Sequence, residues 1–98
     1  MQTRKDVLRR LQGHQQVMRR LGVRRLGLFG SAARGESRPD SDLDFLVELE
    51  RNSFDAYMDL KFFLEDLFQC RVDLVLADTV KPRLREGILK ETAYVPGL

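Results

Sequence analysis

Three acidic residues in two apolar segments could together hold a divalent metal ion. Asp42 and Asp44 flank one residue at the start of an apolar segment, and Asp73 lies within a second such segment. Alternate side chains of a strand point to the same face, so Asp42 and Asp44 would lie about 7 Å apart on it. Unpaired carboxylates repel each other, and a bridging Mg²⁺ removes this conflict with the oxygen ligands that it prefers. If adjacent strands bring Asp73 beside them, the three acids predict a site for one or two Mg²⁺.

Each acid also has an ordinary structural explanation. Asp42 could cap a turn while Asp44 lies on a solvated strand face. Asp73 could form a salt bridge with Arg71 or Arg34, which would relieve the cost of a charge in an apolar strand. The metal hypothesis therefore depends on the three acids meeting in space.

A turn rich in small residues, at 30–35, lies where an expected strand ends. Gly30 has no Cβ, so a ligand phosphate could approach the backbone closely. We expect Ser31 to cap a one-turn helix that extends to Arg34 and is closed by Gly35, with N–H groups free to bind an anion. Arg34 could add a charge-assisted hydrogen bond to the same phosphate. A tight strand-to-helix turn without a ligand is the alternative.

A phosphate-binding turn beside three carboxylates is the layout of two-metal phosphoryl or nucleotidyl transfer. One metal would activate an incoming hydroxyl, and the other would neutralise a triphosphate and its leaving pyrophosphate. Asp73, which lies further along the chain, is the better candidate to contact the attacking hydroxyl.

The elements that must position these residues follow from apolar spacing. Thr3 and Asp6 form a helix-start signal, and apolar residues at steps of three and four predict a helix over about 4–21 that ends at Gly22. A β-type segment over 23–29 leads into the small-residue turn. The remaining predicted elements are a strand over 43–49, a long helix begun by Asn52 or Ser53, a strand over 71–76, a short helix capped by Thr79 with Pro82 in its first turn, and a short edge at Tyr94 and Val95.

This order predicts an α/β (α+β) fold with a mixed β-sheet of three or four strands flanked by helices. The connection between the first two strands is too short and loop-like to indicate a parallel crossover, so we expect a mixed sheet. Residues 1–98 are expected to form a single small domain, because domains typically contain about 100–150 residues.

Composition excludes several protein classes. The longest uninterrupted apolar stretch covers four residues, 74–77, so we expect no membrane span. One cysteine, Cys70, cannot form an internal disulfide, and the chain starts without a signal-peptide core, so a cytoplasmic location is expected. Cys70 and His14 are interpreted as packed residues rather than zinc ligands.

The net charge of +2 hides an uneven distribution. Residues 1–25 carry eight basic side chains against one acidic one, whereas residues 36–78 carry twelve acidic side chains against four basic ones. The basic helix could be a solvated face, a surface for an acidic partner protein or a contact for nucleic-acid phosphates. No aromatic residues separate its arginine pairs, so base readout is not indicated and direct nucleic-acid binding is not expected.

The two motifs together resemble a known family. The combined pattern resembles the signature of the polymerase-beta-like nucleotidyltransferase superfamily, and its size and form resemble the minimal nucleotidyltransferase (MNT) branch, which includes antitoxins. The resemblance covers roughly residues 23–76. It rests on Gly30-Ser31-x-x-Arg34-Gly35 and on Ser41-Asp42-x-Asp44-x-x-Val47.

The resemblance implies a role for each motif residue. Gly30 and Ser31 would contact the triphosphate of ATP, and Arg34 matches the motif beside them. Asp42 and Asp44 would hold Mg²⁺, and Asp73 would complete the set and act towards the acceptor. For many members the resemblance also implies a HEPN-domain toxin as partner, with AMP transferred to toxin tyrosines in some systems.

The leading hypothesis is therefore an Mg²⁺-dependent nucleotidyltransferase that transfers AMP from ATP to a tyrosine of a HEPN-type toxin. The alternatives are nucleotidyl transfer to a small hydroxylated molecule and a non-catalytic antitoxin that neutralises its partner by contact. A chain of 98 residues has little room for a domain that grasps the acceptor, so a partner or a second copy should complete the site.

Overall fold

The structure is a computed structural model that describes residues 3–36 and 42–98. Ser41 of the acidic motif lies outside the described residues. In chain order, the elements are α1 (Arg4–Gln12), α2 (Gln15–Arg20), β1 (Val23–Phe29), α3 (Gly30–Ala33), β2 (Leu43–Leu49), α4 (Phe54–Phe68), β3 (Val72–Leu76), the 3₁₀ turn η1 (Ala77–Thr79), α5 (Pro82–Glu91) and β4 (Ala93–Tyr94).

The strands form one mixed sheet in the order β3-β2-β1-β4. β1 lies between β2 and β4 and pairs antiparallel with both. β2 and β3 are parallel, and α4 supplies the crossover between them. The predicted mixed sheet of three or four strands flanked by helices is confirmed.

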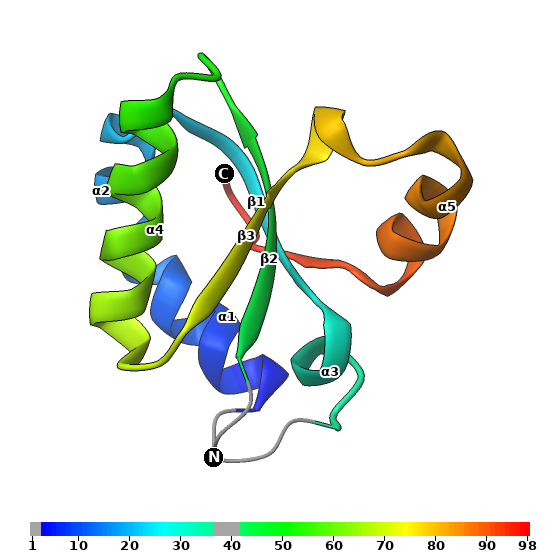
Figure 1. The fold of residues 1–98 in the computed structure, drawn as a ribbon. Coiled ribbons are helices and arrows are strands. Elements are labelled where there is room, and N and C mark those ends of the chain that lie inside the picture. The colour runs from blue at the N-terminus through cyan, green and yellow to red at the C-terminus, as the bar shows by residue number, and fades with distance from the viewer. Residues whose placement is uncertain (1–2, 37–41) are drawn as a thin grey trace.

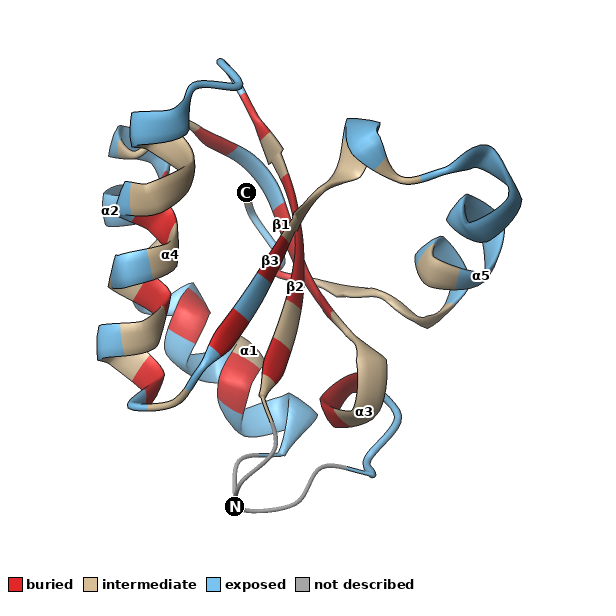
Figure 2. Ribbon diagram, in the orientation of Figure 1, coloured by how far each residue is buried: buried red, intermediate tan, exposed pale blue. Residues whose placement is uncertain are grey.

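The helices divide between the two faces of the sheet. α1, α2 and α4 cover one face, whereas α3 and α5 lie on the other side (Figure 1). The core lies under α1, α2 and α4, and buried residues line the facing sides of these helices and of the sheet (Figure 2). Its largest fully buried side chains include Phe45, Leu11, Met18, Leu26 and Leu60.

The predicted single helix over 4–21 is wrong, because the chain breaks into α1 and α2 at Gly13. The Gly13 N–H donates to the carbonyls of Arg10 and Leu11, which ends α1 with a tight turn. Glycine has the lowest helix propensity of any residue except proline, so the break costs little here. The capping box between Thr3 and Asp6 is confirmed by hydrogen bonds in both directions.

The start of α5 also differs from the prediction. Its N-cap is Lys81 rather than Thr79, which lies in η1 and donates its hydroxyl hydrogen to the Leu76 carbonyl at 2.8 Å. Pro82 occupies the first turn as expected, because its missing N–H has no partner there in any helix. Ser53 caps α4 through the Ala56 N–H. The short edge strand is present, but β4 covers Ala93–Tyr94, one residue earlier than the predicted Tyr94 and Val95.

α5 is packed less tightly than the helices on the opposite face. None of its residues is buried, and a cavity of about 400 Å³ separates it from the sheet. Leu46 and Glu48 of β2 line this cavity, whereas their neighbours Phe45 and Val47 point into the core. The side of the sheet that carries Leu46 therefore stays partly open beneath α5. No helix in the described part of the chain is long and apolar enough to cross a membrane.

Candidate active site

Asp44 and Asp73 lie opposite each other on the parallel strands β2 and β3. Their neighbours Phe45 and Leu74 are buried in the core, so strand alternation directs both carboxyls to the opposite, partly open side of the sheet. Sheet register therefore brings together two of the three acids that the sequence indicated.

The environment raises the pKa of Asp44 from its ordinary value of 3.8 to about 6. Burial is the main cause, because it disfavours the charged form. The charge of Asp73 and its hydrogen bond add to the shift, the charge of Asp42 adds further, and Arg34 acts in the opposite direction. Near neutral pH, Asp44 thus carries a negative charge, and among the described residues it forms no ion pair.

Asp42 precedes β2 and is half-buried. Its charge raises the pKa of Asp44 and also adds to the rise in the pKa of the Cys70 thiol, for which burial is the main cause. Within residues 3–36 and 42–98, no three His, Cys, Asp or Glu side chains are grouped closely enough to count as a metal centre. Asp42 thus acts on Asp44 through its charge, from the residue before β2.

Asp73 has no ion pair with Arg71 or Arg34 among the described residues. The guanidinium of Arg34 is instead held by two glutamates. The salt bridge that offered an ordinary explanation for Asp73 is thus missing, and its side chain is exposed on an edge strand.

Gly30 lies directly against Asp44. Phe29, the last residue of β1, is the register partner of Asp44, and Gly30 follows it with a φ of +74°. A Cβ built on Gly30 would lie 3.0 Å from Cγ of Asp44, so only glycine leaves room for this carboxylate. The small-residue turn and the acids therefore form a single site.

Ser31 does not cap a helix, contrary to the prediction. α3 begins one residue earlier, at Gly30, and its N-cap is Phe29, which has no capping side chain. The positive φ of Gly30 turns the chain from strand to helix within one residue, which places Ser31 inside the helical turn. The backbone carbonyl of Ser31 accepts a hydrogen bond from the Glu36 N–H at 2.8 Å.

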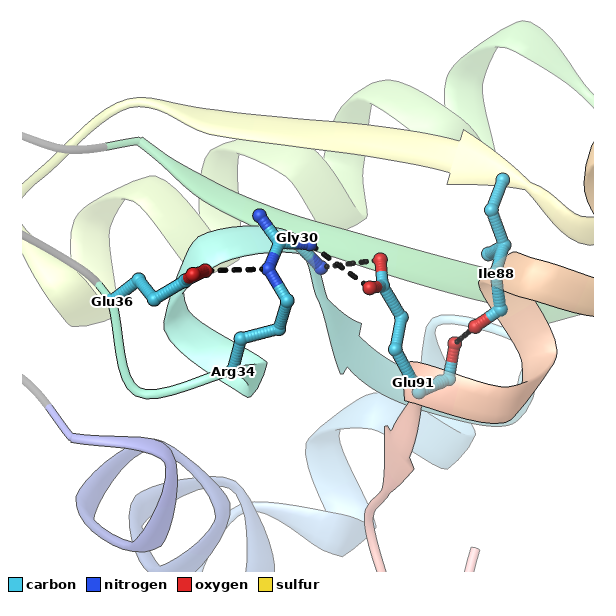
Figure 3. A network of polar contacts seen from close by, with 6 residues as sticks. Gly30, Arg34, Glu36, Ile88 and Glu91 are labelled. Carbon is cyan, nitrogen blue, oxygen red and sulfur yellow. Dashed lines mark hydrogen bonds and ion pairs between the residues drawn. The ribbon is translucent and has the colours of Figure 1, made fainter.

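A residue that the sequence analysis missed completes the turn. Glu91, the last residue of α5, accepts hydrogen bonds from the Gly30 N–H at 3.1 Å and from Nη1 of Arg34 at 2.9 Å (Figure 3). Nε of Arg34 donates to Glu36 at 2.7 Å, and these bonds, that to Glu36 first, raise the pKa of Arg34. The one sequence signal for Glu91 was an acid at a helix C-terminus, where the helix dipole disfavours it.

The cavity beneath α5 opens on the same side of the sheet as Asp44. Leu46 and Glu48 follow Asp44 at alternate positions of β2 and line it. Glu48 pairs with Arg25 at 3.4 Å, and the Arg25 guanidinium lies 4.0 Å from the centre of the Tyr94 ring. A cavity with charged and aromatic walls thus lies on the same side of the sheet as Asp44.

The fold and the site together define the class of protein. A mixed sheet in which a Gly-Ser turn ends one strand, beside paired acids on the next two, is the arrangement expected of a minimal nucleotidyltransferase. Residues 11–95 match the family model described as nucleotidyltransferase domain. The chain belongs to this family and is a nucleotidyltransferase.

Individual relatives agree with this assignment. The protein adenylyltransferase MntA of Thermococcus cleftensis is 41% identical over 87 residues, which cover 87% of this chain and 88% of the relative. A solved structure titled as a minimal nucleotidyltransferase is 38% identical, superimposes with a TM-score of 0.81, and is matched over 95% of this chain and 96% of its own.

A more distant structure shares the fold. It is the complex of a tri-AMPylated HEPN toxin of Shewanella oneidensis with an MNT antitoxin. The matched chain is 19% identical with a TM-score of 0.62, and the match covers 89% of this chain and 70% of that one.

Proposed function

We propose that this chain transfers the adenylyl group of ATP to a hydroxyl acceptor, and that the acceptor is a tyrosine of a HEPN-type toxin which the chain thereby neutralises in the cytoplasm. The observation that carries this proposal is the Asp44–Asp73 pair, which lies opposite in register and directly beside Gly30. The adenylyltransferase name of the Thermococcus cleftensis relative supports adenylyl transfer. The AMPylated toxin bound to a protein of the same fold supports the partner.

Asp44, Asp73 and Asp42 are the residues that would hold Mg²⁺. Carboxylate oxygens are the ligands that Mg²⁺ prefers. Besides burial, the charges of Asp73 and Asp42 raise the pKa of Asp44, and a cation bound there would relieve this repulsion. The donor set therefore fits the metal. When bound, the ion would supply charge neutralisation for the triphosphate and for the leaving pyrophosphate.

The chain's own residues bind and orient the substrates. The Gly30 N–H, the Ser31 hydroxyl and the Arg34 guanidinium supply hydrogen bonds to the phosphates of ATP. All three lie in one short turn beside Asp44, which directs the α-phosphate towards the acidic pair. Orientation of this kind is a large part of catalysis in phosphoryl transfer.

Asp73 is placed to face the acceptor. Its side chain is exposed on the edge strand β3, whereas Asp44 is half-buried beside it on β2. The acceptor hydroxyl oxygen forms a bond with the α-phosphorus, the bond from this phosphorus to the bridging oxygen of the β-phosphate breaks, and pyrophosphate leaves. Asp73 accepts the hydroxyl proton, so the products are an AMP ester and pyrophosphate.

The test is a labelling reaction with α-labelled ATP, Mg²⁺ and the protein that co-purifies with this chain. We expect label on a tyrosine of that protein, and we expect it to disappear in the Asp42→Asn/Asp44→Asn double variant. Asp59→Asn is the matched control, because Asp59 is an exposed acid on α4. A complex that forms without any label would instead identify a binding antitoxin without catalysis.

The cavity beneath α5 favours a second candidate acceptor. Its volume of about 400 Å³ and its polar walls suit a small hydroxylated molecule. In the same labelling reaction, this candidate predicts label on a small molecule rather than on a protein band.

A further inference from the structure

The carboxylate of Glu91 accepts hydrogen bonds from two of the three donors that we assign to the phosphates of ATP. Oε1 of Glu91 accepts the Gly30 N–H, and Oε2 accepts a hydrogen bond from Arg34 (Figure 3). A carboxylate presents two anionic oxygens to these donors much as a phosphate does. Glu91 and a nucleotide phosphate would therefore compete for the same hydrogen bonds.

The position of Glu91 is unfavourable apart from these contacts. It is the last residue of α5, where the partial negative charge of the helix end repels a carboxylate. Its two hydrogen-bond partners, Gly30 and Arg34, lie 61 and 57 positions earlier in the chain. The nucleotide-free site thus contains an anion supplied by the chain itself.

We propose that Glu91 is an internal stand-in for a nucleotide phosphate, which closes the turn in the free protein and is displaced when ATP binds. This inference rests on the proposed function, because it assumes that Gly30 and Arg34 bind phosphate. Glu91 is then a positioning residue that keeps the Arg34 guanidinium beside Gly30 and sets the affinity for nucleotide.

The exchange leaves both donors satisfied. A phosphate that replaces Glu91 gives the Gly30 N–H and the guanidinium of Arg34 new acceptors, while the released carboxylate returns to water. Arg34 also keeps its second partner, Glu36, throughout. Each step exchanges one anion for another, so no buried charge is left unpaired.

α5 can allow this movement. It contains no buried residue, and Arg85, Ile88 and Leu89 line the cavity beneath it. The helix is tied at its start by Arg85, which donates to the Ala77 carbonyl at 3.2 Å, and beyond its end by the pairing of β4 with β1. Glu91 lies between these two attachments and can leave the turn by rotating its own side chain.

The test compares the binding of Mg²⁺-ATP and of pyrophosphate in the wild type, Glu91→Gln and Glu91→Ala by titration calorimetry. Removing the competitor should tighten the binding of both ligands about 5- to 10-fold, which corresponds to one or two weak hydrogen bonds no longer broken on binding. Glu86→Gln is the matched control, because Glu86 lies on the same helix in an exposed pair with Lys90 and should leave both affinities unchanged.

A second measurement separates competition from a structural role. In NMR spectra, the Gly30 amide should shift on Glu91→Gln, and added pyrophosphate should shift the wild-type amide further than the variant's. Weaker or unchanged binding in both variants would overturn the proposal. If the variants bind pyrophosphate more tightly but no adenylyl transfer is found, only the proposed function is contradicted. If transfer is found but the variants bind both ligands as the wild type does, only the role of Glu91 is contradicted.

Discussion

The carboxylate of Asp44 occupies the space that a Cβ on Gly30 would fill. Gly30 has a φ of +74°, and its missing side chain lets the end of β1 and the start of β2 meet without a gap. The turn proposed to bind phosphate and the acid proposed to bind metal are therefore in van der Waals contact. Substituting one of them should disturb the other.

Gly30→Ala should damage both stability and activity. The left-handed backbone costs about 1–2 kcal/mol for any residue with a Cβ, and the new methyl group would also push Asp44 away from Asp73. We expect a lower denaturant midpoint and a loss of adenylyl transfer of about 100-fold or more. Chemical denaturation and labelled-ATP assays measure the two effects.

Gly35→Ala is the control for this substitution. Gly35 has nearly the same φ, +76°, but a Cβ there would meet nothing within 4 Å. It should show the backbone cost of about 1 kcal/mol without the loss of activity. Equal activity losses in the two variants would contradict the role of the Gly30–Asp44 contact.

Metal-free stability should fall as the pH rises from about 4 to about 6. The pKa of Asp44 is 3.8 in an ordinary setting and about 6 in the folded protein, so in this window the folded state keeps a proton that the unfolded chain has released. Asp44→Asn removes this destabilising charge and should stabilise the metal-free protein at pH 7. The gain should be only about 1 kcal/mol, because water partly screens the carboxyl. Urea titrations in EDTA measure the effect.

Asp59→Asn should leave this pH dependence as in the wild type, since that acid is exposed on α4. Added Mg²⁺ should reverse the order of stability, because the wild type gains a bound cation and Asp44→Asn does not. A metal-free wild type whose stability rises between pH 4 and 6 would contradict the raised pKa of Asp44.

Asp73→Asn should reduce the chemical step more than nucleotide binding. Asp73 lies on the edge strand β3, where we propose that it faces the acceptor, whereas the turn at Gly30 is proposed to hold the phosphates. We expect kcat to fall about 100-fold or more, with the Kd for nucleotide changed by less than about 5-fold. Single-turnover labelling and calorimetry together measure this split, and a loss confined to Kd would place Asp73 at the phosphates instead.

Tyr57→Phe should destabilise the protein by about 1 kcal/mol. The Tyr57 hydroxyl of α4 donates a hydrogen bond of 2.6 Å to the carbonyl of Leu74, the residue after Asp73 in β3. Tyr94→Phe is the matched control, because no hydrogen bond of its hydroxyl to another described residue is found, and it should leave the free energy of unfolding nearly unchanged. Denaturant midpoints that are equal for the two variants would contradict the role of the Tyr57 bond.

The sequence by itself determined the elements whose signals are local. Apolar alternation defined 43–49 as a strand, and Ser53 and Pro82 marked helix starts, because capping and strand alternation involve residues a few positions apart. The small-residue turn and the spaced acids were recognisable for the same reason. The break at Gly13 was missed, since one glycine within a periodic pattern is compatible with either a continuous or a broken helix.

Only the tertiary structure decided how these parts meet. The register of β2 on β3 places Asp44 beside Asp73, and that register depends on which face of each strand the whole core buries. The hydrogen bond from the Gly30 N–H to Glu91 joins residues 61 positions apart. The helix dipole disfavours an acid at the end of α5, and only the packing of α5 against the turn at Gly30 decides that this hydrogen bond forms despite that cost. The types of the candidate site residues were therefore recognisable from short sequence patterns. Which charged side chains lie beside one another was decided by long-range packing.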